Sequence, residues 1–430
     1  MTRIVFIGAG SVEFTRNLLG DILTFPELAG ATIVLHDINP ERLETAEAMA
    51  RWTNAAVGAH ATIESRLDRR AALDGADFAI NTIEVGGIDA TRVDFDIPER
   101  YGLRQTIGDT LGVGAVFRAL RTIPVLLSIG RDMAELCPAA WLLNYTNPMA
   151  MNCWAYYAGS PHKRIVGLCH SIQNTSRQLA EYVGVPFDEV TFLGAGVNHM
   201  AWVLRLERGG QTLYPLLDAA IAADPDGLGR HVRVQVYRAF GYFPTESSEH
   251  FAEYVPWFMR DDAEIARLRI PVREYIARSE ENIGFYEDEK RKLAAGEPFE
   301  IERSLEYASL IIHSIVTGAE RAIYGNVRND GLITNLPHGA CVEVPCLVDR
   351  TGVQPVVVGE LPAQCAALDR TFLNVAELTV RAALEGRRDH VLQAILLDPN
   401  AGATLSIAAA EKLADEMLTA HRAALPGALR

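Results

Sequence analysis

The sequence predicts an α/β fold in two domains, and three observations lead to this prediction. The chain has 430 residues, which is too long for one typical domain. Short apolar runs alternate with helical patterns in its first part, as in βαβ units around a parallel sheet. The first of these units begins at Arg3 and contains a glycine turn. We therefore expect a Rossmann-type dinucleotide-binding domain over residues 1–195 and a larger α+β domain over residues 196–430.

The first βαβ unit has the pattern of a dinucleotide site. The run Arg3–Gly8 ends in Gly8-Ala9-Gly10-Ser11, a helical pattern follows, and the run Ala31–His36 ends at Asp37. The glycines let the backbone approach a pyrophosphate at a helix N-terminus, and the acid holds the ribose hydroxyls. Asp37 favours NAD over NADP, because it would repel the 2′-phosphate. Glu13 occupies the third glycine position, so a glycine turn of another α/β protein is the alternative.

Polar side chains follow later strands of the same expected sheet. Thr82 and Glu84 come after the run Ala76–Asn81, and Asn144 ends a further run, with Asn147 close behind. Ligands of such sheets bind outside the carboxyl ends of the strands. We therefore expect Thr82, Glu84 and Asn144 to contact the cofactor and Asn147 to contact the substrate. The alternative for Asn147-Pro148 is ordinary turn chemistry.

A Cys and a His, each after an apolar run, form a candidate metal site. Cys169 ends the run Arg164–Cys169, and His199 ends the run Phe192–His199. We expect two neighbouring strands to bring them together. Thiolate and imidazole bind borderline divalent metals, and two protein ligands leave positions open for water or substrate. The alternative is a small buried Cys and a hydrogen-bonded His.

Composition and charge exclude several kinds of partner. The net charge of −15 argues against nucleic acid and anionic membranes, since both require clustered Lys and Arg. We find no apolar run of transmembrane length. The six Cys do not have the spacing of a disulfide framework, which indicates a reducing cytoplasm where Cys169 stays a free thiol.

Towards the C-terminus, we expect an amphipathic helix over Ser304–Ala322 and three helical segments after Glu360.

Taken together, the motifs resemble glycoside hydrolase family four. The resemblance extends from the N-terminus to about residue 350. It rests on Gly8-Ala9-Gly10-Ser11, Gly108-Asp109-Thr110, the helix start at Arg118–Pro124, Asn144–Pro148, Cys169-His170-Ser171, Gly196–His199, Asn335–Pro337 and Val342–Pro345.

That family is similar in fold to lactate and malate dehydrogenases. The resemblance implies bound NAD, a divalent metal (commonly manganese) held by Cys169 and His199, and reducing conditions. Cys-Asp and Cys-Asn versions of the metal motif resemble 6-phospho-glycosidases. The Cys-His-Ser version, here Cys169-His170-Ser171, is similar to α-galactosidases.

The resemblance also implies a mechanism. NAD⁺ would take a hydride from C3 of the sugar, and the metal would polarise the resulting ketone and acidify the C2 proton. A base would remove this proton, and the aglycone would leave C1 by elimination with help from a general acid. Water would then add and the hydride return. NAD-dependent glycosidases are thus exceptions to the two-carboxylate scheme.

The acid and the base are less well defined. Asp109 matches an acid of the family near the substrate, and His170 would reach a sugar hydroxyl or the leaving group. The stretch Gly241–Tyr254 lies where the family keeps its base, and either His250 or Tyr254 is expected to take this role. The alternatives are a turn or helix-cap role for Asp109 and an ordinary capped helix for the stretch.

Other functions share part of this pattern. Within the family, these are an α-glucuronidase or α-galacturonidase, with an extra Arg or Lys at the sugar C6, and an α-glucosidase. Outside it, an NAD-dependent 2-hydroxy acid dehydrogenase would need an Arg for the carboxylate and no Cys-His pair. A non-catalytic NAD-binding sensor would bind cofactor without turnover. The expected partners are a small glycoside and further copies of the chain, in a homodimer or homotetramer.

Overall fold

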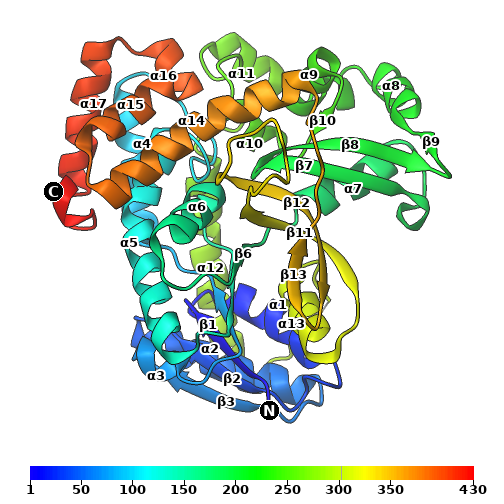
Figure 1. Ribbon diagram of the computed structural model, residues 1–430, viewed down its shortest axis with the longest axis vertical. Coiled ribbons are helices and arrows are strands. Elements are labelled where there is room, and N and C mark those ends of the chain that lie inside the picture. Colours follow the sequence, from blue (N-terminus) through cyan, green and yellow to red (C-terminus); the bar gives the residue numbers. More distant parts are fainter. Residues whose placement is uncertain (302) are drawn as a thin grey trace.

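One continuous sheet of 13 strands runs through the molecule (Figure 1). The computed structural model describes residues 1–301 and 303–430. Along the main path of the sheet the strand order is β10-β8-β7-β12-β11-β6-β5-β4-β1-β2-β3, with β9 beside β8 and β13 beside β12. The end from β6 to β3 is parallel, and the remaining strands pair antiparallel.

The parallel strands form a doubly wound unit. Their order, β3-β2-β1-β4-β5-β6, is that of the Rossmann fold, with the switch in direction between β1 and β4. The α/β fold expected from the glycine turn and the alternating runs is therefore confirmed. The strands are β1 (Arg3–Ile7), β2 (Thr32–His36), β3 (Thr62–Arg66), β4 (Phe78–Asn81), β5 (Trp141–Asn144) and β6 (Ile165–Gly167).

Antiparallel strands extend this sheet without a break. Asn326 of β11 pairs with Gly167 of β6, and Glu343 of β12 pairs with Gly196 of β7. The expected domain boundary at residue 195 falls inside β7 and stays a prediction. The strands are β7 (Thr191–Val197), β8 (Met200–Arg208), β9 (Gln211–Thr212), β10 (Phe243–Pro244), β11 (Arg321–Arg328), β12 (Cys341–Asp349) and β13 (Gly352–Pro355).

Helices cover the sheet, and those of the C-terminal part pack on α4 and α5 (Figure 1). They are α1 (Val12–Leu23), α2 (Pro40–Ala56), α3 (Arg69–Leu73), α4 (Gly87–Arg100), α5 (Val113–Leu136), α6 (Met149–Gly159), α7 (Ser171–Tyr182), α8 (Tyr214–Ala223), α9 (Val232–Phe240), α10 (Ser248–Glu253), α11 (Asp262–Leu268), α12 (Glu274–Ala295), α13 (Tyr307–Thr317), α14 (Ala363–Glu385), α15 (Arg388–Leu397), α16 (Pro399–Thr404) and α17 (Ile407–Ala420). Short 3₁₀ segments lie at Phe187–Glu189, Leu228–Arg230 and Gly427–Leu429.

Two expectations about the C-terminal part were wrong. The helix expected over Ser304–Ala322 is shorter in the structure, where it is α13. Gly318 adopts a φ of +85° and ends this helix before β11 begins. Four α-helices, not three, follow Glu360. The additional break lies between α15 and α16, where Pro399 lacks the N–H that a continuing helix needs and Asp398 caps a new one through Ala401 N.

A third correction concerns α5, which is long and apolar enough to cross a membrane by composition alone. No such run was expected from the sequence. Most of its apolar stretch is buried inside the protein, where it packs against α4, α6 and α14. A helix that is apolar on nearly all sides and enclosed by other elements is a core helix.

A buried ion pair joins α4 and α5. The Arg121 guanidinium donates to both carboxylate oxygens of Asp94, at 2.6 and 3.0 Å, and also to the Val85 carbonyl oxygen. Both charged groups are almost completely buried, and His421 Nε2 lies 2.9 Å from Asp94 Oδ1. A single carboxylate thus connects α4, α5 and the segment after α17.

Replacing Asp94 with alanine should lower the free energy of unfolding by about 3–5 kcal/mol, since Arg121 would keep a buried charge without its partner. Denaturant unfolding followed by circular dichroism measures this loss. Asp89 is the matched control, because it lies on the same helix and pairs with Arg92 at the surface. Asp89→Ala should cost about 1 kcal/mol or less. Equal losses in the two variants would contradict the prediction.

A buried carboxyl on α14 contacts the second half of the sheet. Trp202 Nε1 of β8 donates to Asp369 Oδ1 at 3.0 Å. The other carboxyl oxygen has no hydrogen-bond partner in the described part of the chain. Burial raises the pKa of Asp369 well above its ordinary value of 3.8. The folded protein therefore holds a proton at this site that the unfolded chain releases.

This proton should make stability depend on pH. A raised folded-state pKa contributes stability below the ordinary pKa that is lost as the pH rises towards the folded value. The Asp369→Asn variant keeps an acceptor for Trp202 but cannot ionise. The free energy of unfolding between about pH 5 and pH 8 should therefore fall less steeply in Asp369→Asn than in the parent protein. Parallel pH profiles would show that Asp369 does not titrate on unfolding.

Candidate functional site

The glycine turn between β1 and α1 is shaped to approach a ligand closely. Gly8 adopts a φ of +88°, and the Gly10 N–H donates to Asp37 Oδ2 at 2.8 Å. A Cβ on Gly10 would lie 2.5 Å from that same oxygen. Ser11, the N-cap of α1, forms no side-chain cap, which leaves N–H groups of the first turn available to an anion. These residues fit the pyrophosphate and ribose of a dinucleotide.

The other expected cofactor residues differ in their surroundings. Thr82 Oγ1 donates to the Gly8 carbonyl at 3.0 Å and so braces the glycine turn. Asn144 is fully buried, accepts from Asn81 Nδ2 at 2.8 Å and donates to the Thr146 carbonyl. Glu84 lies 3.2 Å from the buried Arg118. Their contacts with a cofactor stay predictions.

Cys169 and His199 lie close together, with Glu246 as a third member of the cluster. Their ligand atoms all lie within 4.8 Å of one another. Glu246 Oε2 is 3.6 Å from His199 Nε2 and 3.9 Å from Cys169 Sγ. Burial raises the pKa of the Cys169 thiol to about 12, so its proton would have to leave when a metal binds. A thiolate, an imidazole and a carboxylate together suit a borderline divalent metal.

The expectation that neighbouring strands carry Cys169 and His199 was wrong. Strands β11 and β12 lie between β6 and β7. The paired residues Gly167, Asn326, Glu343 and Gly196 form one row across these four strands. Cys169 lies two residues beyond Gly167, between β6 and α7. His199 lies three residues beyond Gly196, in the turn that joins β7 to β8. The site is therefore assembled by the segments beyond the strand ends.

Sequence reasoning missed Glu246, which follows β10 and has a φ of +68°. Its Oε1 is also 3.6 Å from His250 Nδ1. Burial would raise the pKa of this carboxyl, but His199, His250 and His170 outweigh that effect and lower it. The available signal was a carboxylate next to the expected base in the stretch Gly241–Tyr254. Neither the expected base nor the capped helix gives that carboxylate a role.

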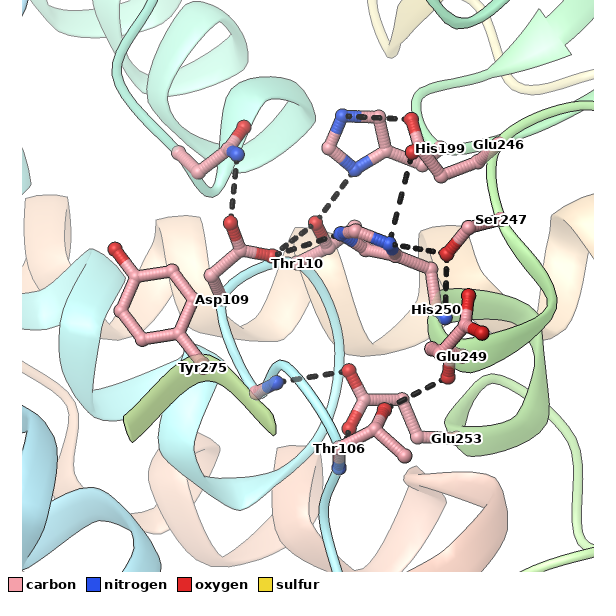
Figure 2. A network of polar contacts seen from close by, with 12 residues as sticks. Thr106, Asp109, Thr110, His199, Glu246, Ser247, Glu249, His250, Glu253 and Tyr275 are labelled. Atoms are coloured by element: carbon pink, nitrogen blue, oxygen red, sulfur yellow. Dashed lines mark hydrogen bonds and ion pairs between the residues drawn. The ribbon is translucent and has the colours of Figure 1, made fainter. Parts of the chain in front are cut away.

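A network of polar contacts surrounds Asp109 beside this cluster (Figure 2). Asp109 Oδ2 accepts from Asn147 Nδ2, and Oδ1 accepts from Thr110 Oγ1, each at 2.8 Å. His250 Nε2 lies 3.9 Å from Asp109 Oδ1. Although burial alone would raise the pKa of Asp109, His250, His199 and the Arg118 guanidinium lower it. Asp109 is therefore a carboxylate, and it faces an imidazole.

His250 and Tyr254, the two candidates for the base, occupy different environments. Burial lowers the pKa of His250, which favours the neutral imidazole, and its Nδ1 lies 3.0 Å from Ser247 Oγ. Tyr254 is completely buried and packs edge-on against Phe251 and Phe372. Burial raises the pKa of Tyr254 well above its ordinary value. A neutral imidazole can accept a proton at neutral pH, whereas a phenol with a raised pKa stays protonated.

His170 lies at the exposed side of the cluster, with about half of its side chain accessible. Its Nδ1 lies 3.0 Å from Glu306 Oε1. The hydrogen bond with Glu306 is the main cause that raises the pKa of His170 to about 9. At neutral pH, His170 is thus an imidazolium that can donate to a ligand hydroxyl.

A second buried carboxyl supports the loop that carries Asp109. Glu253, at the end of α10, accepts from the backbone N–H groups of Thr106 and Gly108, each at 2.8 Å (Figure 2). Burial raises the pKa of Glu253 to about 8. These bonds fix the loop against α10, the helix that presents His250. Glu253 was also missed in the sequence, because its partners lie some 145 residues away.

Comparison with known proteins identifies the family. The model of the family 4 glycosyl hydrolases matches residues 3–185, and the model of the C-terminal domain of the same family matches residues 194–401. The chain belongs to family 4 of the glycosyl hydrolases. The resemblance stated from the motifs is therefore confirmed, and the protein is a glycosidase by family.

Similar proteins cover nearly the whole glycosidase. An α-galactosidase from Bacillus subtilis (strain 168) is 43% identical over 99% of each chain. An α-galactosidase from Rhizobium meliloti (strain 1021) is 36% identical over 99% of this chain and 89% of its own. In fold, the glycosidase is similar to a 6-phospho-α-glucosidase from gut microorganisms in complex with NAD and Mn²⁺ (TM-score 0.83, 20% identity, 99% of each chain). A malate dehydrogenase from Plasmodium falciparum is more distant (TM-score 0.53, 16% identity, 90% of this chain and 99% of its own).

The three-residue cluster gives a direct prediction for metal binding. Cys169→Ser and His199→Ala should each weaken Mn²⁺ binding by more than about 100-fold, because substituting a residue that only hydrogen-bonds to a metal ligand already costs about 10- to 100-fold. Glu246→Gln should weaken it as well, since an amide is a poorer ligand than a carboxylate. Isothermal titration calorimetry measures these affinities.

Substitution of the exposed His338 provides the control, because it removes an imidazole elsewhere on the molecule. His338→Ala should leave Mn²⁺ affinity unchanged. Nucleotide affinity should stay near normal in all variants, since the glycine turn is separate from the cluster. Parental Mn²⁺ affinity in Cys169→Ser or His199→Ala would show that the metal is held elsewhere.

Proposed function

We propose that this glycosidase is an NAD- and Mn²⁺-dependent α-galactosidase. The observation that carries the proposal is the 43% identity to an α-galactosidase over 99% of both chains. The Cys169-His170-Ser171 motif and its position beside His199 and Glu246 support it. The enzyme acts in the reducing cytoplasm, because Cys169 binds a metal only as a reduced thiolate.

The residues fit both groups. The Gly8–Ser11 turn and Asp37 would hold NAD, and Cys169, His199 and Glu246 would hold the metal. When bound, NAD supplies a hydride acceptor and the metal supplies a Lewis acid that makes the C2 proton of the oxidised sugar removable.

The side chains around this site have separable tasks. His250 accepts the C2 proton, and Asp109, 3.9 Å away, stabilises the imidazolium that results. Asn147 fixes the orientation of Asp109 through its 2.8 Å hydrogen bond. His170, held by Glu306, donates to a sugar hydroxyl or to the departing oxygen.

An unphosphorylated, neutral sugar suits the charges of the site better than a uronate. Asp109 and Glu246 lie inside it, and the buried Glu343 lies behind it, bonded to Asn198. A carboxylate on the sugar would be repelled by these acids unless a free cation faced it. Among the described residues, the cations near the site already have partners. The Arg118 guanidinium is bonded to Glu84 and Tyr275, the His170 imidazolium to Glu306, and the Arg233 guanidinium to Thr175 and Gln178. We therefore favour an α-galactoside over an α-galacturonide.

Activity assays test the proposal directly. Nitrophenyl α- and β-glycosides of galactose, glucose and galacturonic acid are incubated with and without NAD⁺, Mn²⁺ and a thiol. We expect release of nitrophenol from the α-galactoside, and only when all three additions are present. Hydrolysis after exhaustive chelation and removal of NAD⁺ would overturn the cofactor dependence. Net formation of NADH would instead indicate a dehydrogenase.

Exchange at C2 tests the role of His250. Galactose released in D₂O should carry deuterium at C2, as measured by NMR, because the proposed base removes that proton during turnover. His250→Ala should lower the rate of exchange by about 10²- to 10⁴-fold, the usual contribution of a general base. Tyr254→Phe is the comparison, and it should have the smaller effect because its hydroxyl stays protonated. The opposite ranking would assign the base to Tyr254, and hydrolysis without deuterium at C2 would exclude elimination.

A further inference from the structure

The loop that carries Asp109 also contacts the imidazole of His199. Thr110 Oγ1 lies 2.7 Å from His199 Nδ1 and 2.8 Å from Asp109 Oδ1, and all three side chains are buried. Figure 2 shows the hydroxyl between the carboxylate and the imidazole, with His199 Nε2 on the far side facing Glu246. We propose that Thr110 is a positioning residue that fixes the tautomer of His199 and so leaves Nε2 free to bind the metal.

The number of available protons determines which groups donate and which accept in the hydrogen bonds among Asp109, Thr110 and His199. A threonine hydroxyl has one proton to donate and can accept at its oxygen. The two carboxylate oxygens of Asp109 accept from Asn147 and from Thr110, so the Thr110 proton points to Asp109 Oδ1. If it pointed to His199 instead, two oxygens without a proton between them would face each other at 2.8 Å. His199 Nδ1 must therefore carry a proton and donate it to Thr110 Oγ1.

The tautomer determines what the other ring nitrogen can do. A neutral imidazole with its proton on Nδ1 has its lone pair on Nε2. That atom is 3.6 Å from Glu246 Oε2, and Glu246 and His199 form the cluster with Cys169. Metal-binding histidines commonly donate their second N–H in this way, which fixes the ring and increases its basicity as a ligand. The inference rests on the proposed metal-dependent function, and it adds a residue that acts on the metal through His199.

The same contacts connect the metal side of the site to the substrate side. Asp109 is held by Asn147 on one oxygen and by Thr110 on the other. The backbone on the preceding side of the loop is fixed by Glu253 through Gly108 N. A shift of Asp109 would therefore move the acceptor that orders Thr110, and with it the donor bond of His199.

Two measurements on the NAD-bound protein test the proposal. Mn²⁺ affinity, measured by calorimetry, should fall by about 10- to 100-fold in Thr110→Val, which keeps the shape but removes the acceptor. Thr110→Ser, which restores the hydroxyl, should recover most of this affinity. Thr379→Val removes a different buried hydroxyl, one that bonds the Val375 carbonyl within α14, away from this loop. This control should leave Mn²⁺ affinity unchanged.

The tautomer itself can be observed without a metal or a variant of Thr110. Long-range ¹H–¹⁵N spectra of ¹⁵N-histidine-labelled protein, assigned with His199→Gln, should show a protonated Nδ1 and an unprotonated Nε2. A proton on Nε2 in the parent protein would overturn the proposal even if Thr110→Val failed to fold. Parental Mn²⁺ affinity in a folded Thr110→Val would do so as well. Absence of Mn²⁺ binding to the parent protein would instead contradict the proposed function, while the tautomer result would still stand.

Discussion

The site depends on the backbone row that joins the parallel and antiparallel parts of the sheet. Gly167, Asn326, Glu343 and Gly196 lie side by side across β6, β11, β12 and β7. Their pairing fixes the position of the segment after β6, which carries Cys169, and of the β7–β8 turn, which carries His199. Because backbone pairing sets these positions, Cys169 and His199 lie close together without any ligand.

Buried carboxyl groups arrange the rest of the site around this frame. Glu253 holds the loop of Asp109 through backbone N–H groups, and Glu246 lies between His199 and His250. Each would be costly to bury alone, and each has polar or cationic partners that offset the cost. The acids of the site therefore determine its geometry as well as its chemistry.

Local sequence was sufficient to predict some parts of this molecule but not others. The glycine turn and Asp37 follow from one βαβ unit, and the Cys169–His199 pair follows from residue types that ligate metals. The role of Glu246 could not be predicted, since it requires β10 to bring a carboxylate to residues far away in sequence. The break between α15 and α16 was missed, although Pro399 signals it. The order of β6, β11, β12 and β7 arises from pairings between distant segments, which periodicity does not encode.

The sheet continues through both halves of the chain, so strand pairing joins the halves directly. Rotating one half against the other would break the pairings of β6 with β11 and of β12 with β7. Many enzymes with two separate domains admit and enclose their substrates by such a rotation. Here the strand pairings oppose such a rotation, and the loops and helices beyond the strand ends are the parts that can open and close around a sugar.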